Sequence, residues 1–185
     1  MTSTRLYAGM RDGSLELFYI KEEERLFAII GGRVLDYKEL PSEETRFLDH
    51  IIDSEPETKL ILEGWFPSRK EQKRKLAECR FGGLNFTPDY EDGVFAADSF
   101  DCPLKNKCLG FGKVCKSIEY KGIPLDSFDE KAISLLISAK KNTVIAEELE
   151  IPLGSFEVYR TKLYNSLRIS TKQELASVAF ILGLI

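Results

Sequence analysis

The sequence predicts an α+β protein with a small N-terminal α/β unit, a loop-rich four-cysteine module and a C-terminal four-helix domain. Three observations support this fold class. Near the N-terminus, apolar residues alternate with polar ones, as they do in strands. Glycine, proline and all four cysteines of the 185-residue chain gather in its middle part. In the last third, capping residues precede apolar residues at helical spacing. The expected domains are 1–66, 67–122 and 123–185.

Three short strands are expected first. Leu15, Leu17 and Tyr19 alternate with polar or semi-polar neighbours, and residues 25–30 form a second apolar run. A pair of glycines then allows a sharp bend before a third strand over 33–37.

Two helices and a further strand follow in the expected N-terminal unit. A helix is predicted from Pro41, because proline and acidic residues favour the first turn of a helix. A strand is predicted at 59–63, and a second helix from Pro67 and Ser68 to about Cys79. This unit contains no chemical motif, so we interpret it as an interaction or dimerisation module that engages a partner.

Positive charge concentrates in the second of these helices. The basic run comprises Arg69, Lys70, Lys73, Arg74, Lys75 and Arg80. Two interpretations stay open, the solvated face of a helix and a contact with nucleic acid. The whole chain has 26 basic and 30 acidic side chains, so it lacks the overall basic character that many nucleic-acid-binding proteins show.

The four cysteines predict one metal centre. They are Cys79, Cys102, Cys108 and Cys115, with the spacing C-x22-C-x5-C-x6-C. Glycine- and proline-rich loops bury little apolar surface, and a metal supplies the missing stabilisation. A 4Fe–4S cluster is favoured over Zn²⁺, because short C-x2–4-C knuckles are absent and Pro103 follows Cys102. The alternative is four reduced cysteines that pack without a ligand.

The C-terminal residues have the pattern of a helix-turn-helix. Asp126 and Ser127 precede a first apolar helix, and Thr143 is expected to cap a short second helix. Ser155 is expected to cap a longer third helix, and Thr171 begins a last one. Two helices joined by a tight turn within a four-helix unit are typical of DNA-binding domains.

Residues 125–180 resemble the helix-turn-helix of the LuxR/GerE family of transcription regulators. Asn142-Thr-Val-Ile-Ala-Glu-Glu-Leu149 is similar to the family's scaffold helix, and Leu163-Tyr-Asn-Ser-Leu-Arg-Ile169 to the end of its recognition helix. Ser170-Thr-Lys-Gln-Glu-Leu175 is similar to the start of its final helix. The resemblance implies binding of double-stranded DNA and a homodimer formed through the C-terminal helix, residues 171–184.

A second resemblance covers the cysteines. The pattern from Cys79-Arg-Phe-Gly-Gly-Leu84 through Asp101-Cys102-Pro103 to Gly112-Lys-Val-Cys115 is similar to a module in regulators of phages and mobile elements. That module precedes a similar helix-turn-helix.

The resemblance also implies candidate DNA contacts. These are Lys141, Asn142, Thr143, Ser155, Val158, Arg160, Thr161, Lys162 and Asn165. Val158 suits a thymine methyl group, Asn165 a base edge and Lys162 a phosphate. Glu157 departs from the family, which usually has a basic residue there, and a carboxylate at this position would repel phosphate.

The expected function is therefore a cytoplasmic DNA-binding transcription regulator with a cysteine-ligated centre. The alternative is a helix-turn-helix that binds a protein, as an antirepressor or as an inhibitor of a host factor. An enzyme is not expected, because the chain has no phosphate-binding glycine loop of the known forms. A membrane span is not expected either, because no long apolar run occurs.

Overall fold

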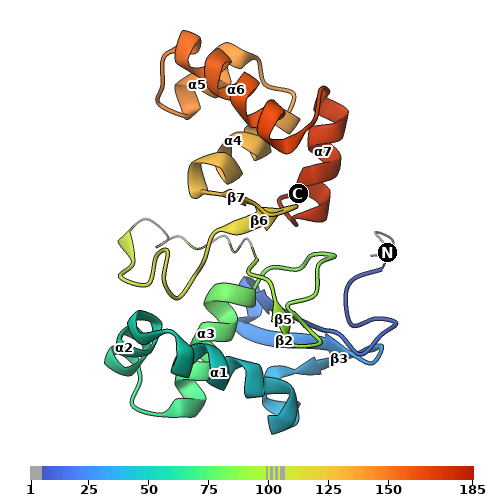
Figure 1. The fold of residues 1–185 in the computed structure, drawn as a ribbon, viewed down its shortest axis with the longest axis vertical. Helices are drawn as coiled ribbons and strands as arrows, with labels where there is room; N and C mark the ends of the chain where they lie inside the picture. The colour runs from blue at the N-terminus through green and yellow to red at the C-terminus, as the bar shows by residue number, and fades with distance from the viewer. Residues whose placement is uncertain (1–5, 99, 101, 103, 105–106) are drawn as a thin grey trace. The chain divides into compact units, whose positions relative to one another are not determined.

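The structure, a computed structural model, describes residues 6–98, 100, 102, 104 and 107–185. The chain divides into two compact units, Met1–Lys116 and Ser117–Ile185 (Figure 1). The expected α+β class is confirmed, since the described residues form α-helices together with antiparallel sheets. The boundaries differ from the expected three domains. Residues 67–116 belong to the same unit as 1–66, because the helix that contains Cys79 shares a core with the first strands.

The first unit is built on an antiparallel sheet. Its described strands are β1 (Leu15–Ile20), β2 (Arg25–Ile30), β3 (Arg33–Asp36), β4 (Tyr90–Glu91) and β5 (Val94–Phe95), in the order β3-β2-β1-β4-β5. Leu17 lies opposite Ala28 in the β1–β2 pair. Gly31 and Gly32 both have positive φ, which the two-residue turn between β2 and β3 requires. The three strands predicted near the N-terminus are confirmed.

Helices cover one face of this sheet. The helical elements are η1 (Lys21–Glu23), η2 (Tyr37–Glu39), η3 (Ser42–Thr45), α1 (Arg46–Ser54), α2 (Pro56–Trp65) and α3 (Arg69–Phe81). The helix predicted from Pro41 is present as η3 and α1. Ser68 caps α3 as predicted, because its side chain accepts the Glu71 N–H.

The strand predicted at 59–63 is wrong, because these residues lie inside α2. Pro56 occupies the first turn, where its missing N–H costs no hydrogen bond. Thr58 and Leu62, four residues apart, are buried, whereas Leu60 is exposed. The burial therefore follows helical spacing.

The core of the first unit lies between the sheet and the helices. Leu15 and Leu17 of β1 contribute to it, together with apolar residues from α1, α2 and α3. Val114, just before the last cysteine, belongs to the same core and is fully buried. The segment that contains Cys108 and Cys115 is therefore anchored to the first unit by apolar contact.

The second unit consists of a hairpin and a helical bundle. Its elements are β6 (Ile118–Tyr120), β7 (Ile123–Leu125), α4 (Ser127–Ile137), α5 (Asn142–Glu148), α6 (Leu153–Leu167) and α7 (Lys172–Ile181). The four predicted helices are present. Asp126 and Thr171 each form a capping box, with Asp129 and Glu174 respectively.

Two predicted caps need correction. Helix α5 begins at Asn142, so Lys141 and not Thr143 is its N-cap. Helix α6 begins at Leu153, so Pro152 and not Ser155 precedes it. A proline fits this place, because its fixed φ leads directly into a helix. Among the helices of the described residues, none is long and apolar enough to cross a membrane.

Candidate functional site

A tight turn joins α5 to α6 and sets their relative direction. Glu150 adopts a left-handed conformation with φ 58°, and the Ile151 N–H donates to the Ala146 carbonyl over 3.1 Å. This arrangement satisfies carbonyls at the end of α5 that have no partner within the helix. The chain then turns at Pro152 into α6, so a short, defined connection joins the two helices.

Helix α6 has one buried face and one exposed face. Phe156, Leu163 and Leu167 are buried in the core of the second unit, where Phe156 is fully buried. The opposite face carries an exposed stripe, which we call the α6 stripe: Val158, Thr161, Lys162 and Asn165. Residues three, four and seven positions apart lie on one side of a helix, so these four side chains form one continuous surface.

The carboxylate of Glu157 is engaged within the unit. Its Oε1 accepts the Asn142 side-chain N–H over 2.8 Å, and its Oε2 pairs with the Arg160 guanidinium over 2.8 Å. These contacts join the start of α5 to the first turns of α6. They also offset the negative charge that the sequence suggested would repel phosphate. Asn142 and Arg160, predicted as DNA contacts, therefore have structural partners.

The other predicted DNA residues are exposed. Lys141 and Thr143 lie at the start of α5, and Ser155 lies in the first turn of α6. Ser155, Val158 and Lys162 also line a shallow hollow next to Tyr159. The Tyr159 hydroxyl donates to Asp129 over 2.6 Å, and its ring packs edge-on against Phe128, which holds α6 to α4. The predicted residues thus surround the exposed side of α6.

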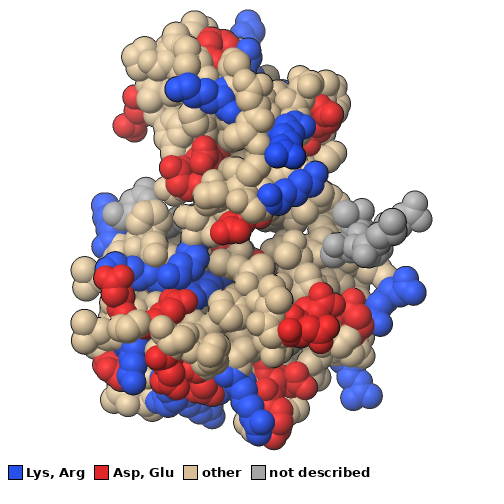
Figure 2. All heavy atoms as spheres, viewed as in Figure 1, with Lys and Arg blue, Asp and Glu red and all other residues tan. Residues whose placement is uncertain are grey.

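The second unit has mixed charge. Lys140 pairs with Glu148 over 2.7 Å, and the Lys131 ammonium donates to the Glu148 carbonyl. On the face that Figure 2 shows, basic and acidic side chains of this unit are interspersed. The exposed cations Lys141 and Lys162 therefore stand on a surface that is not basic as a whole.

The cysteine-containing segments are held to the end of α3 by Arg80. This arginine, the residue after Cys79, is almost fully buried. Its guanidinium pairs with Glu55 over 2.7 Å and donates to the carbonyls of Lys113 and Val114 over 2.6 and 2.8 Å. Arg80 thereby fixes the segment before Cys115 next to the helix that contains Cys79.

The backbone of Arg80 fixes the second cysteine-containing segment. The Asp98 N–H donates to the Arg80 carbonyl over 2.8 Å, four residues before Cys102. The residues of the basic run therefore do not form one surface. Arg80 is buried and holds neighbouring segments, whereas Lys75 pairs with Glu78. Asp101 and Pro103, part of the predicted cysteine pattern, lie outside the described residues.

All four thiols are half-buried and unbridged. The Gly110 N–H donates to Cys108 Sγ over 3.3 Å, and Cys115 Sγ donates to the Gly110 carbonyl over 3.5 Å. The pKa of Cys79 is raised to about 12, mainly by burial; Lys75 opposes the shift, and the charges of Glu78, Cys115 and Cys102 add to it. Cys79 therefore lies within electrostatic range of two other cysteines.

These contacts suit a thiolate centre in part. The N–H donated to Cys108 Sγ is the kind of outer contact that orients a metal-bound thiolate. However, among the described residues no three His, Cys, Asp or Glu side chains have the arrangement of a metal site. The structure thus brings the cysteine-containing segments together without placing their sulfur atoms as a ligand set.

Two further features of the first unit were not predicted from the sequence. Glu16, Asp89 and Asp98 are buried together in the first unit, although Glu16 alternates with the apolar residues of β1. The second feature is a cavity beside α3 with basic lining residues. The basic run at 69–74 was visible in the sequence, but neither the buried carboxyl groups nor the cavity could be predicted, because both are formed by segments far apart in the sequence.

Comparisons of the chain with protein-family models, with curated proteins and with solved structures found no match.

Proposed function

We propose that the protein is a transcription regulator that binds double-stranded DNA through α6. The observation that carries this proposal is the α6 stripe, exposed on the second of two helices that a tight turn joins. The major groove of DNA admits one α-helix, and the base edges within it are read by short polar and apolar side chains. The resemblance of residues 125–180 to LuxR/GerE-type domains supports the same proposal.

The α6 stripe supplies distinct kinds of contact. Val158, exposed at the start of the stripe, suits the methyl group of thymine, and Asn165 suits the hydrogen-bonding edge of a base. Lys162 suits a phosphate, as does the exposed Lys141 at the start of α5. Arg160 and Asn142 act indirectly, by pairing with Glu157 and so orienting α6 against α5.

We propose in addition that the protein acts as a homodimer through residues 171–184. Phe180 in α7 is an exposed aromatic residue, 45% accessible, and Ile185 just beyond the helix is 68% accessible. A second copy of this surface would cover both side chains. Two copies of α6 would then contact two half-sites on the DNA.

The four cysteines, we further propose, bind a metal that braces the cysteine-containing segments. The supporting observations are the electrostatic proximity of Cys79 to Cys102 and Cys115, and the N–H contact to Cys108. A zinc ion or a 4Fe–4S cluster would supply cross-links between these segments. Binding would release protons, because thiols such as Cys79 must lose theirs to become ligands.

The DNA proposal is tested by selecting duplexes from a random pool with the full chain. Binding of the enriched duplex is then measured by fluorescence anisotropy at several salt concentrations. We expect Lys162→Ala to weaken binding to all sequences and to reduce the salt slope by about one. Asn165→Ala is expected to change the base preference at one position.

Lys121→Ala is the matched control, because Lys121 is also exposed but lies at the β6–β7 turn, over the Tyr120 ring. It should bind like the parent protein. Failure to enrich any sequence at low salt would overturn the DNA proposal, as would parental binding by Lys162→Ala.

The metal proposal is tested on protein purified without air. Iron and sulfide with broad absorbance near 400 nm would identify a cluster, and one zinc per chain without colour would identify a zinc site. Cys79→Ser and Cys115→Ser should each lower the metal content. A folded, metal-free protein would overturn the proposal.

A further inference from the structure

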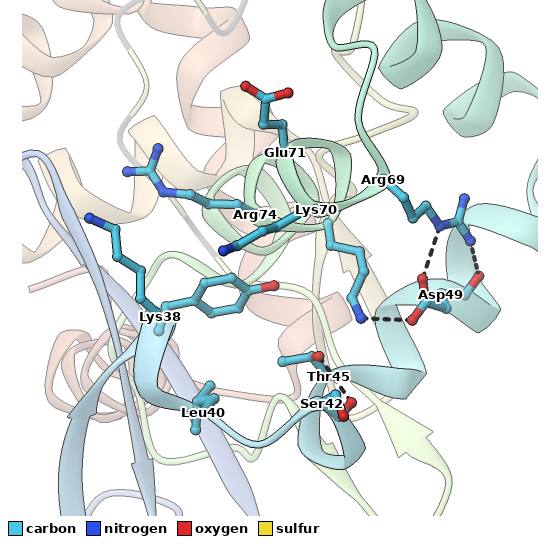
Figure 3. A pocket seen from close by; sticks show the side chains of 11 residues that line it. Lys38, Leu40, Ser42, Thr45, Asp49, Arg69, Lys70, Glu71 and Arg74 are labelled. Atoms are coloured by element: carbon cyan, nitrogen blue, oxygen red, sulfur yellow. Dashed lines mark hydrogen bonds and ion pairs between the residues drawn. The ribbon is translucent and has the colours of Figure 1, made fainter.

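A cavity of about 580 Å³ opens on the first unit, between the N-terminal half of α3 and the segment from η2 to α1 (Figure 3). Its lining residues are Tyr37, Lys38, Leu40, Ser42, Thr45, Asp49, Arg69, Lys70, Glu71, Lys73 and Arg74. This volume is in the range of sites that bind small organic molecules. The lining contains five basic and two acidic side chains, in a chain that is acidic overall.

Of the two acidic side chains that line the cavity, one is paired with basic side chains and the other points away from the cavity. Asp49 accepts from the Arg69 guanidinium over 2.9 Å and from the Lys73 ammonium over 2.7 Å. Glu71 accepts the Ser68 hydroxyl over 2.6 Å, and Figure 3 shows its carboxylate pointing away from the other labelled side chains. A metal cation would therefore find no free carboxylate among these lining residues.

Three basic side chains remain for a ligand. Among the described residues, no carboxylate lies within ion-pair distance of Lys38, Lys70 or Arg74. Arg74 donates one N–H to the Glu24 carbonyl over 3.2 Å, which positions its guanidinium and leaves other donors available. Figure 3 shows that the side chains of Lys38 and Arg74 both extend to the left, on the far side of the cavity from Asp49. This end of the cavity is therefore positive.

The rest of the lining is suited to a planar or apolar group. Tyr37 and Leu40 are half-buried residues of the cavity wall. An aromatic ring next to cationic side chains is a combination that binds phosphorylated ligands with a flat base, because bases stack on aromatic rings. Ser42 adds an exposed hydroxyl at the rim.

We propose that this cavity binds a nucleoside phosphate. The phosphate would lie against Lys38, Lys70 and Arg74, and the base against Tyr37 and Leu40. All four basic residues at 69–74 then have a defined place, since Arg69 and Lys73 hold Asp49 and the other two face the phosphate. The site would be separate from the DNA surface on α6, so the two proposals stand or fall independently.

The test is isothermal titration of the full chain with the four common ribonucleoside 5′-monophosphates. Inorganic phosphate and the free nucleosides serve as probes for the two halves of the ligand. We expect at least one monophosphate to bind, more tightly than either half and less tightly as salt rises. Lys38→Ala and Lys70→Ala should each weaken this binding about tenfold or more, because each removes a charge-assisted hydrogen bond.

Arg33→Ala is the matched control, because Arg33 is an exposed cation at the start of β3, outside the cavity. It should bind like the parent protein, and circular dichroism should show that all three variants are folded. The proposal is overturned if no monophosphate binds, or if Lys38→Ala and Lys70→Ala both bind like the parent protein. It is also overturned if the same lysines are needed for an oligonucleotide but no monophosphate binds.

Discussion

The buried carboxyl groups of Glu16, Asp89 and Asp98 make the first unit sensitive to pH. The exposed fractions of these residues are 0%, 0% and 5%. The Leu17 N–H donates to Asp89, the Asn85 side chain donates to Asp98, and the Asn85 N–H donates to Glu16 over 2.7 Å. Each carboxyl group still has one buried oxygen without a donor among the described residues. A proton on Asp89 would supply such a donor to Asp98.

Burial raises the pKa of all three groups, because the charged form loses its hydration. The pKa of Glu16 is raised to about 10 and that of Asp98 to about 8. Burial and then the charges of Asp98 and Glu16 raise the pKa of Asp89 well above its usual range. Between about pH 5 and pH 8, Glu16 and Asp98 bind protons in the folded chain and release them on unfolding. The free energy of unfolding therefore falls as pH rises through this window.

The size of the effect follows from linkage. Each group that is protonated only in the folded state lowers the free energy of unfolding by about 1.4 kcal/mol per pH unit. Glu16→Gln removes one such group and keeps the geometry, because the amide oxygen can accept the Asn85 N–H. The free energy of unfolding of this variant, relative to that of the parent protein, should rise by about 3 kcal/mol between pH 5 and pH 7.

Urea denaturation followed by the fluorescence of Trp65 measures this change. Trp65 is the single tryptophan of the chain and lies in α2, so it reports on the first unit. Asp92→Asn is the control, since Asp92 is an exposed carboxyl in the β4–β5 turn. The reasoning is refuted if Glu16→Gln and the parent protein show the same pH slope, or if the stability of the parent protein rises with pH over this window.

Three other predictions concern the remaining sites. Phe156→Ala should lower the free energy of unfolding of the second unit by about 3–5 kcal/mol, because it empties a fully buried position. The second unit should then unfold first, and circular dichroism during heating measures the loss of helix. Gly110→Ala should lower the metal content of the purified protein, because a Cβ there would lie 2.6 Å from the Trp65 ring; unchanged metal would contradict this reasoning. Glu157→Ala should strengthen non-specific DNA binding at low salt, because it removes a carboxylate and frees Arg160; anisotropy with an arbitrary duplex measures it, and weaker binding would contradict it.

The helices of the second unit could be predicted because their signals are local. Asp126 and Thr171 mark helix starts through capping boxes, and apolar residues such as Phe156 recur at helical spacing. The exact starts of α5 and α6 could not be predicted. Threonine and serine often cap helices, but Thr143 and Ser155 lie inside these two helices.

The first unit was less predictable because its decisive contacts join distant segments. The apolar run at 59–63 fits a strand or a helix equally well, and only the burial of Thr58 and Leu62 distinguishes them. Glu16 alternates with Leu15 and Leu17 as an exposed strand residue would, yet residues 85–98 cover it. Nothing in the neighbourhood of Glu16 in the sequence indicates this cover.

The candidate sites show the same contrast. The α6 stripe follows from helix periodicity, so all four of its residues could be named in advance. The role of Glu157 could not, because its partners Asn142 and Arg160 depend on how α5 packs on α6. The sequence also did not predict that members of the basic run at 69–80 have different environments. Arg80 is buried, whereas Lys70 lines a cavity.

The most direct test of DNA binding through α6 is to map the backbone amide signals of the full chain while an enriched duplex is added. The proposal predicts the largest chemical-shift changes at Val158, Thr161, Lys162 and Asn165, with smaller changes near Lys141. Changes confined to other surfaces of the second unit, or no changes at low salt, would contradict it.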